Sequence, residues 1–294
     1  MNDNMRSMKA EYESCRVLIE KRLEEFFIGG YPYDKLIESM RYSLLAGGKR
    51  IRPVLCLKFC EASGGTISKA LDAACAIEML HTYSLIHDDL PCMDDDDMRR
   101  GAASNHIMYG ELTATLAGDA LQAAAFEALL LSELPPGSIV EMAKILADAA
   151  GVHGICGGQY LDMDKSRQDF CEITEIHKLK TAALISAAAK IGVVSAGGTQ
   201  EQLAAAEQYA LAVGFAFQVR DDILDITATA EELGKPIGAD QRNDKKTFAA
   251  LMDIEECEEI ICIETNKAIA ALTGKFNNTN FLVWLAKMLS ERKA

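Results

Sequence analysis

The sequence predicts an all-α protein, and three observations support that prediction. Hydrophobic residues make up 49% of the 294 residues but aromatic residues only 6%, so the core is expected to consist mainly of Ala, Leu, Ile, Val and Met, which pack well between helices. Apolar residues recur every three or four positions over long segments, and strict alternation is rare. Pairs of turn residues separate these segments.

Five long periodic segments are expected to be helices, at residues 67–89, 112–131, 139–150, 172–196 and 200–226. With the shorter periodic segments, the bundle should contain about ten or more helices. Breaks are expected at Gly29-Gly30-Tyr31-Pro32, Gly47-Gly48, Gly64-Gly65, Pro135-Pro136, Gly157-Gly158, Gly197-Gly198 and Gly234-Lys235-Pro236. Gly supplies turn conformations there, and Pro ends helices.

A single domain spanning residues 1–294 is expected. Pro135-Pro136 is the best candidate for a boundary, but two chemically matched acidic motifs, around Asp88 and Asp221, lie on opposite sides of it. One site built from both halves of the chain implies one domain.

Charge and composition exclude several classes of protein. The formal net charge of −14 argues against a nucleic-acid partner, because phosphate backbones are bound by basic surfaces. A polyanionic substrate would need metal ions or a local basic cluster. The nine cysteines are scattered without a C-x-x-C pair, which indicates small core residues in a reducing compartment. We expect a cytoplasmic protein, because no signal peptide or membrane-spanning segment is recognisable.

The acidic motif at Asp221-Asp222-Ile223-Leu224-Asp225 lies inside a helical pattern. At about 100° per residue, Asp221 and Asp225 lie about 40° apart on the helix and share one face. Carboxylates clustered on an apolar helix repel one another unless cations bind, and Mg²⁺ prefers oxygen ligands. The alternative is a solvated acidic face.

The other acidic motif runs from Asp88-Asp89 through Pro91 to the Asp94–Asp97 stretch, and Arg99 and Arg100 follow. Asp88 and Asp94 are six residues apart, about 240° on an unbroken helix, so they would point to different sides. A kink at Pro91 would bring both carboxylates round to one centre.

These motifs resemble those of the short-chain trans-polyprenyl diphosphate synthase family. The resemblance covers roughly residues 44–251 and includes Gly47-Gly48-Lys49-Arg50-Ile51-Arg52-Pro53, Gly118-Asp119, Gly157-Gly158-Gln159, Lys180-Thr181 and Gly234-Lys235. The stretch His81-Thr82-Tyr83-Ser84-Leu85-Ile86-His87 is similar to the bacterial farnesyl diphosphate synthases, or geranyltranstransferases. The resemblance implies an isoprenoid synthase-like bundle around a deep central cavity, and a homodimer. It also implies Mg²⁺, three ions with diphosphate bound.

The implied reaction joins isopentenyl diphosphate to dimethylallyl or geranyl diphosphate. The allylic diphosphate ionises, the resulting carbocation condenses with isopentenyl diphosphate, and a proton is then lost to give farnesyl diphosphate. By resemblance the metal ligands are Asp88, Asp94 and Asp221, and Asp89, Asp222 and Asp225 support them. The allylic diphosphate is assigned to Arg99, Lys180, Thr181, Gln218 and Lys235, and the metal-free diphosphate to Lys49, Arg52, His81 and Arg100.

Several of these assignments have ordinary alternatives. His81, on an apolar helix, would more often be a core histidine, and Lys180 is uninformative alone; only their joint placement around two acidic motifs favours a site. Where relatives carry Gly-Lys and a small residue, this chain has Asn243-Asp244-Lys245-Lys246-Thr247. Lys245 fits the expected diphosphate contact best, and Lys246 remains an alternative.

Product length is assigned to the helix that precedes Asp88. Tyr83 and Ser84 lie five and four positions earlier, one turn further from the metals and near the same face. By resemblance, Tyr83 is the floor that stops the prenyl chain at C15, although an ordinary packing role is the alternative. Geranyl or geranylgeranyl diphosphate remains open as the main product. A non-catalytic partner subunit is disfavoured because both acidic motifs and the arginine pair are present, and a terpene cyclase because the second motif retains its Asp residues.

Overall fold

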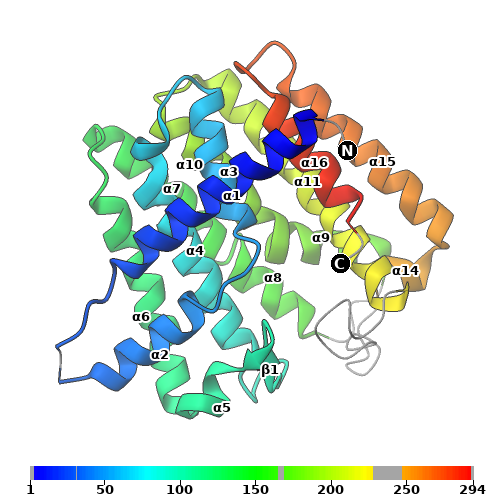
Figure 1. Ribbon diagram of the computed structural model, residues 1–294. Helices are drawn as coiled ribbons and strands as arrows, with labels where there is room; N and C mark the ends of the chain where they lie inside the picture. Colours follow the sequence, from blue (N-terminus) through cyan, green and yellow to red (C-terminus); the bar gives the residue numbers. More distant parts are fainter. Residues whose placement is uncertain (1–2, 31, 165–168, 228–246, 293–294) are drawn as a thin grey trace.

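The computed structural model describes residues 3–30, 32–164, 169–227 and 247–292, and within these residues the fold is built mainly from helices (Figure 1). The first half contains α1 (Asp3–Glu24), α2 (Asp34–Leu44), α3 (Ile51–Ala62), α4 (Ile67–Asp88), α5 (Asn105–Tyr109), α6 (Glu111–Leu130) and α7 (Pro136–Ala150). The second half contains α8 (Ile155–Asp162), α9 (Phe170–His177), the π-helix η1 (Lys178–Ala182), α10 (Ala183–Ser195), α11 (Gln200–Thr227), α14 (Phe248–Leu251), α15 (Ile254–Leu272) and α16 (Asn280–Ser290). The all-α prediction is confirmed.

The long predicted helices fall close to where the apolar periodicity placed them. The segment expected at 67–89 is α4, that at 112–131 is α6, and that at 200–226 is α11. The helix expected at 172–196 is helical throughout but divides into α9, η1 and α10. The π-turn is the difference that periodicity did not predict, and such turns occur frequently at functional sites.

A two-stranded ribbon follows α4, and it was not predicted. Strand β1 (Met98–Arg99) pairs antiparallel with β2 (Ala102–Ala103). The connecting residues Arg100 and Gly101 have φ angles of 54° and 77°, the positive values that the tightest hairpin turns require. The ribbon therefore carries Arg99 at the end of its first strand and Arg100 in its turn, and Arg99 reaches Asp89 at the end of α4.

The main hydrophobic core lies around α4 and α10. α4 packs against α3, α6 and α10, and α11 packs against α10 and α15. The buried cluster extends from Tyr12 of α1 to Leu289 of α16, and it includes Leu129 and Met142 on either side of Pro135-Pro136. Burying one such side chain stabilises the fold by about 1.5–3 kcal/mol, so this shared core holds both ends of the chain together.

A smaller core cluster forms where α9, α11, α14 and α15 meet. Phe248 of α14 lies at its centre, fully buried, and contacts the rings of Phe170, His177 and Phe215. This cluster fixes the part of α11 that carries the second acidic motif, because Val219 and Ile223 belong to it.

The interpretation of all nine cysteines as core residues is wrong for four of them. Cys15, Cys56, Cys60, Cys75 and Cys257 are buried, whereas Cys92, Cys156, Cys171 and Cys262 are exposed, and all nine are free thiols. Within the described ranges, no helix combines the length and apolar character needed to cross a membrane.

Candidate active site

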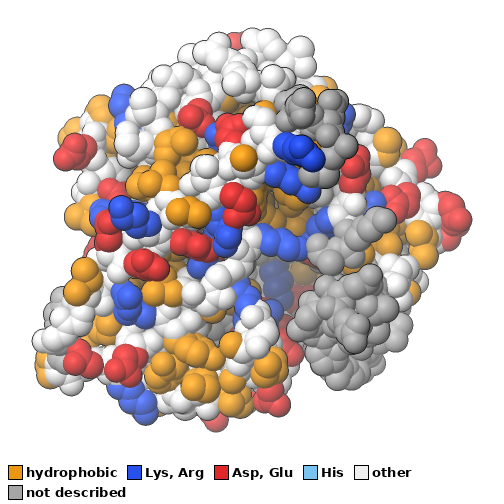
Figure 2. All heavy atoms as spheres, viewed as in Figure 1, with side chains coloured by type: hydrophobic (Ala, Val, Ile, Leu, Met, Phe, Trp, Pro, Cys, Tyr) orange, Lys and Arg blue, Asp and Glu red, His pale blue; other side chains and the backbone are white. Residues whose placement is uncertain are grey.

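A cavity of about 570 Å³ lies between the C-terminal half of α4, α8 and η1. Its wall is largely apolar, with Leu85, Met93, Ile155 and Leu184 among the lining residues. It also gathers seven residues predicted from the sequence, namely Arg52, His81, Tyr83, Ser84, Asp88, Lys180 and Thr181. Figure 2 shows Lys and Arg side chains around a hollow in one face of this acidic protein.

The first acidic motif does not form by a kink at Pro91, and that expectation is corrected. α4 ends at Asp88, before the proline, and Asp89 caps it. The chain then turns back, so that the backbone nitrogen of Asp94 donates to the Asp88 carbonyl oxygen over 2.9 Å. The turn, rather than a bent helix, brings Asp94 beside Asp88.

Lys180 projects from η1 toward the end of α4. Its Nζ lies 2.7 Å from Asp162 Oδ2 and 3.6 Å from Asp88 Oδ1. The cation thus bridges the predicted metal ligand to Asp162, the last residue of α8, which sequence reasoning did not identify. Its position four residues after Gly158 in the Gly157-Gly158-Gln159 motif was the available signal.

Arg99 is held by the acidic motif itself. Its Nε donates to Asp89 Oδ1 over 2.8 Å, its Nη2 also contacts that oxygen, and Asp96 lies 3.3 Å away. Burial raises the pKa of Asp89 to about 6, and Arg99 partly offsets that rise. Asp89 therefore orients Arg99, while Asp88 faces the cavity.

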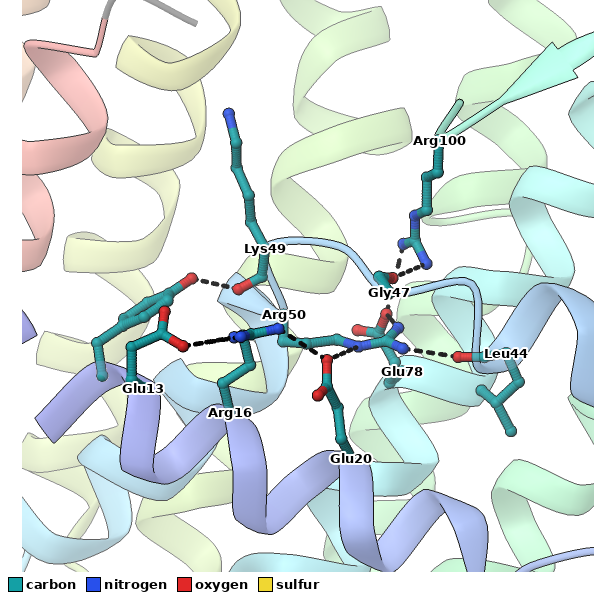
Figure 3. A network of polar contacts seen from close by, with 10 residues as sticks. Glu13, Arg16, Glu20, Leu44, Gly47, Lys49, Arg50, Glu78 and Arg100 are labelled. Atoms are coloured by element: carbon teal, nitrogen blue, oxygen red, sulfur yellow. Dashed lines mark hydrogen bonds and ion pairs between the residues drawn. The ribbon is translucent and has the colours of Figure 1, made fainter. Parts of the chain in front are cut away.

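A buried network organises the loop before α3, where the sequence predicted the pocket for a metal-free diphosphate (Figure 3). Glu78 of α4 is 1% exposed and forms ion pairs with Arg50 and, at 3.5 Å, with Arg100. Arg100 Nη1 also donates to the Gly47 carbonyl oxygen over 2.6 Å, and Tyr12 donates to that of Lys49. The Lys49 side chain extends away from this network in Figure 3.

Sequence reasoning missed Glu78. A lone acid within the apolar run Ala73–Leu80 was its signal, because a buried carboxylate requires a cationic partner.

Arg52 and His81 meet in the cavity wall. Arg52 Nη1 donates to His81 Nε2 over 3.3 Å. Burial, and then the neighbouring arginines, hold the pKa of His81 well below its usual range. His81 is therefore neutral with its proton on Nδ1. Burial also lowers the pKa of Arg52 to about 10, a value that leaves it cationic at neutral pH.

His87, six residues further along α4, has a structural role. Its Nε2 donates to the Thr115 carbonyl oxygen over 2.9 Å. A Cβ on Gly118 would lie 2.1 Å from that nitrogen, so the glycine of the Gly118-Asp119 motif makes room for the imidazole.

Asp221 of the second acidic motif is paired with the guanidinium group of Arg292, which follows α16. Arg292 forms an ion pair with Asp221, lies 3.8 Å from the Phe217 ring centroid, and donates to the Phe217 carbonyl oxygen over 3.2 Å. Burial lowers the pKa of Lys49, and Arg292 adds to that effect while Asp221 opposes it. Lys49, Asp221 and Arg292 therefore interact electrostatically.

The remaining polar residues of α11 connect the motif to its surroundings. Gln218 accepts a hydrogen bond from Thr181 Oγ1 over 3.2 Å and donates to Asp222 Oδ1 over 3.3 Å. Asp222 Oδ2 accepts from the Phe248 backbone nitrogen over 2.8 Å. Asp225 is 8% exposed, and its Oδ1 is buried with no hydrogen-bond partner in the described part of the chain.

The donor set suits Mg²⁺, although the predicted ligands do not form a ready-made cage. Within the described residues, no three Asp, Glu, His or Cys side chains converge closely enough to hold a metal ion by themselves. Mg²⁺ is usually held by one or two carboxylates together with substrate phosphate and water, so such a cage is not needed. Asp88 and Asp221 each already face a cationic side chain, and the buried Asp225 Oδ1 receives no hydrogen bond from any described residue.

Three predicted diphosphate contacts, Lys235, Lys245 and the alternative Lys246, lie outside the described residues.

The described residues form a mainly helical protein with a cavity that is lined by both acidic and basic groups, Asp88, Lys180 and Arg52 among them. Helicobacter pylori geranyltransferase, solved with magnesium and isoprenyl diphosphate, has the same fold, with a TM-score of 0.82 and 33% identity over 98% of this chain and 97% of that one. The sequence profile described as polyprenyl synthetase matches residues 33–278. The chain belongs to the polyprenyl synthetase family and is a prenyltransferase, as predicted.

Two curated relatives are similar to this chain over most of its length. A dimethylallyltranstransferase of Fischerella ambigua is 46% identical over 246 residues, covering 82% of this chain and 71% of the relative. Geranylgeranyl pyrophosphate synthase 3 of Arabidopsis thaliana is 47% identical over 233 residues, covering 76% of this chain and 64% of that synthase. Only the second of these two names specifies a product.

Proposed function

We propose that this prenyltransferase condenses isopentenyl diphosphate with dimethylallyl or geranyl diphosphate and releases farnesyl diphosphate and pyrophosphate. One observation carries the proposal. The 570 Å³ cavity has Asp88, Lys180 and Thr181 in its wall together with Tyr83, about 7.5 Å earlier along the axis of α4. An anionic head and an apolar tail would be bound by different parts of the same cavity.

The allylic diphosphate would lie at Lys180 and Thr181, with Arg99 and Gln218 completing the anionic end. Lysine provides a compact charge and arginine a fork that matches phosphate oxygens. Gln218 holds the Thr181 hydroxyl in position. These residues orient the leaving group and stabilise the charge that develops as its C–O bond breaks.

Isopentenyl diphosphate would bind at Lys49, Arg52, His81 and Arg100. Glu78 fixes Arg100, and neutral His81 accepts from Arg52, so this pocket is basic but contains a hydrogen-bonding imidazole rather than a fourth cation. The different composition of the two pockets would order two chemically similar substrates.

Mg²⁺ would be held by Asp88, Asp94 and Asp221, with Asp89, Asp222 and Asp225 in support. When bound, the ions neutralise negative charge on the departing diphosphate. The magnesium in the Helicobacter pylori structure supports this proposal. Asp88 and Asp221 must then exchange their present cations, Lys180 and Arg292, for metal.

Tyr83 supports a C15 product. Its ring is 5% exposed, stacks edge-on against His87 with centroids 5.7 Å apart, and its hydroxyl lies 3.7 Å from Cys156 Sγ. Contacts to two helices hold a bulky ring in the cavity wall, as a pocket floor requires. The geranylgeranyl names among the relatives favour a C20 product as the second candidate.

We also propose a homodimer. Apolar side chains on α5 and α6 are exposed, with Ile107 and Met108 at 53%, Leu112 at 75% and Leu116 at 48%. An apolar surface of this kind is typical of a protein interface, and a second copy would bury it. Analytical ultracentrifugation should show a dimer, and Leu112→Glu should weaken its association. A wild-type monomer at micromolar concentration would refute the proposed homodimer.

The proposed activity is tested by incubating the chain with Mg²⁺, isopentenyl diphosphate and geranyl diphosphate, followed by mass analysis. Farnesyl diphosphate is the expected main product. A C20 diphosphate would favour the second candidate, and the absence of any prenyl diphosphate product would refute both.

A further inference from the structure

We propose that Asp162 is a positioning residue that sets the place of the Lys180 ammonium group for the allylic diphosphate. This inference rests on the proposed function, because it assigns a task to Lys180 at the same site. The contact with Asp162 is the shorter of the two that Lys180 makes, 2.7 Å against 3.6 Å to Asp88. Asp162 is thus the principal partner of this lysine.

The backbones of α8 and η1 approach each other closely beside the Asp162–Lys180 pair. Lys180 lies in a π-turn and Asp162 is the last residue of α8. A Cβ on Gly158, one turn before Asp162, would lie 2.3 Å from the Lys180 backbone nitrogen and 2.7 Å from its Cα. Only glycine allows α8 to approach η1 so closely. The approach places the Asp162 carboxylate within reach of the lysine from the same helix.

The charges explain why a second carboxylate is useful. A lysine side chain is flexible and carries its charge at one point. Without Asp162, the nearest anionic partner of Lys180 among the described residues would be Asp88, the predicted metal ligand. The ammonium group would then compete with metal for Asp88 instead of remaining available to phosphate. With Asp162 in place, one N–H stays tethered and the others remain free to donate.

Both side chains are only partly exposed, Lys180 at 25% and Asp162 at 17%. The pair is therefore screened by water less than a surface ion pair. A side chain held in this way can be misplaced by losing its partner, and displacement of a catalytic group by about 1 Å can cost about 100-fold in rate.

The test compares Asp162→Asn with the control Glu175→Gln. Glu175 also forms an ion pair with a lysine, its Oε2 lying 3.6 Å from Lys178 Nζ, but it is exposed. Titration calorimetry measures the Kd for inorganic pyrophosphate in Mg²⁺, and kinetics give kcat/KM for geranyl diphosphate. Removing a negative charge near an anion site would by itself tighten pyrophosphate binding. A positioning role predicts the opposite change for Asp162→Asn, namely pyrophosphate binding that is about 10- to 100-fold weaker and a lower kcat/KM. Both values for Glu175→Gln should stay within about twofold of those of the wild type.

A double-mutant cycle with Lys180→Met tests whether Asp162 acts through the lysine. The effect of Asp162→Asn should disappear in the Lys180→Met background, and Asp162→Glu should restore part of the loss. Circular dichroism checks that each variant is folded. Unchanged or tighter pyrophosphate binding in Asp162→Asn, or an equal loss in both backgrounds, would overturn the inference. Pyrophosphate titration reports on Lys180 even if no prenyl product forms, so failure of the proposed function would be seen separately in the wild-type product assay.

Discussion

Arg292 forms an ion pair with Asp221, so the first carboxylate of the second acidic motif is paired with a cation from a distant part of the chain. The guanidinium also stacks on Phe217 and donates to its carbonyl oxygen. Only 10% of the Arg292 side chain is exposed, against 38% for Asp221. A metal ion that binds Asp221 must therefore compete with an arginine held by three contacts.

Arg292→Ala is expected to strengthen divalent metal binding in the absence of substrate, by about 3- to 10-fold, because it removes this competing charge. Titration with Mn²⁺, followed by electron paramagnetic resonance, measures the change. Lys287→Ala is the matched control, since Lys287 is an exposed cation on the neighbouring helix α16. Equal metal affinity in wild type and Arg292→Ala would show that the ion pair does not restrict Asp221.

Tyr83→Ala is expected to shift the main product from C15 toward C20 or longer, because it removes the ring from the cavity wall without altering the anionic end. Mass analysis of the prenyl diphosphates measures the shift. Tyr83→Phe keeps the ring and loses the hydroxyl with its contacts to Cys156 and Gln122, so its product should be unchanged. A folded, active Tyr83→Ala variant that still stops at C15 would show that Tyr83 is not the floor.

Glu78→Gln is expected to lower the free energy of unfolding by about 3–5 kcal/mol, because it removes the buried carboxylate that pairs with both Arg50 and Arg100 and leaves Arg50 only the more distant Glu20, at 3.9 Å. Arg50 and Glu78 side chains are 1% and 2% exposed. Urea denaturation measures the loss. Glu61→Gln, at an ion pair with Lys58 in which Glu61 is 41% exposed, should cost less than about 1 kcal/mol; similar losses in both variants would contradict the buried-network assignment.

His177 should make stability depend on pH in the acidic range. Burial lowers its pKa to about 4; Lys180 lowers it further and Asp162 opposes them. The unfolded imidazole binds a proton near pH 6.5 and the folded one does not, so its stabilising contribution is complete above pH 6.5 and is lost as pH falls toward 4. The loss reaches up to about 3 kcal/mol, and His177→Gln should remove it. Denaturation at pH 7.0, 5.5 and 4.5 measures this; equal slopes in both proteins would contradict the assignment.

Sequence reasoning predicted the parts of the fold and site that depend on local pattern. The apolar periodicity of α4, α6 and α11 predicted their bounds within a few residues. The first acidic motif pointed to Asp88 and the family resemblance to Lys180, and these two side chains lie 3.6 Å apart in the cavity wall. Partners distant in the sequence escaped it. Arg292 lies far beyond Asp221 and carries no motif, and Asp162 meets Lys180 only because Gly158 allows α8 to approach η1. The π-turn and the β1–β2 ribbon depend on tertiary contacts that no periodicity records.

The central claim is that Asp88 and Asp221 supply the metal ligands for loss of diphosphate from the allylic substrate. The most direct measurement is kcat for wild type, Asp88→Asn and Asp221→Asn across a range of Mg²⁺ concentrations, with circular dichroism to verify the fold. We expect wild-type turnover to require Mg²⁺ and to stop in excess chelator. Each variant should lose about 1,000-fold or more in kcat while remaining helical, because the lost interaction acts on the transition state. Full turnover in excess chelator, or an undiminished kcat in either folded variant, would contradict the account.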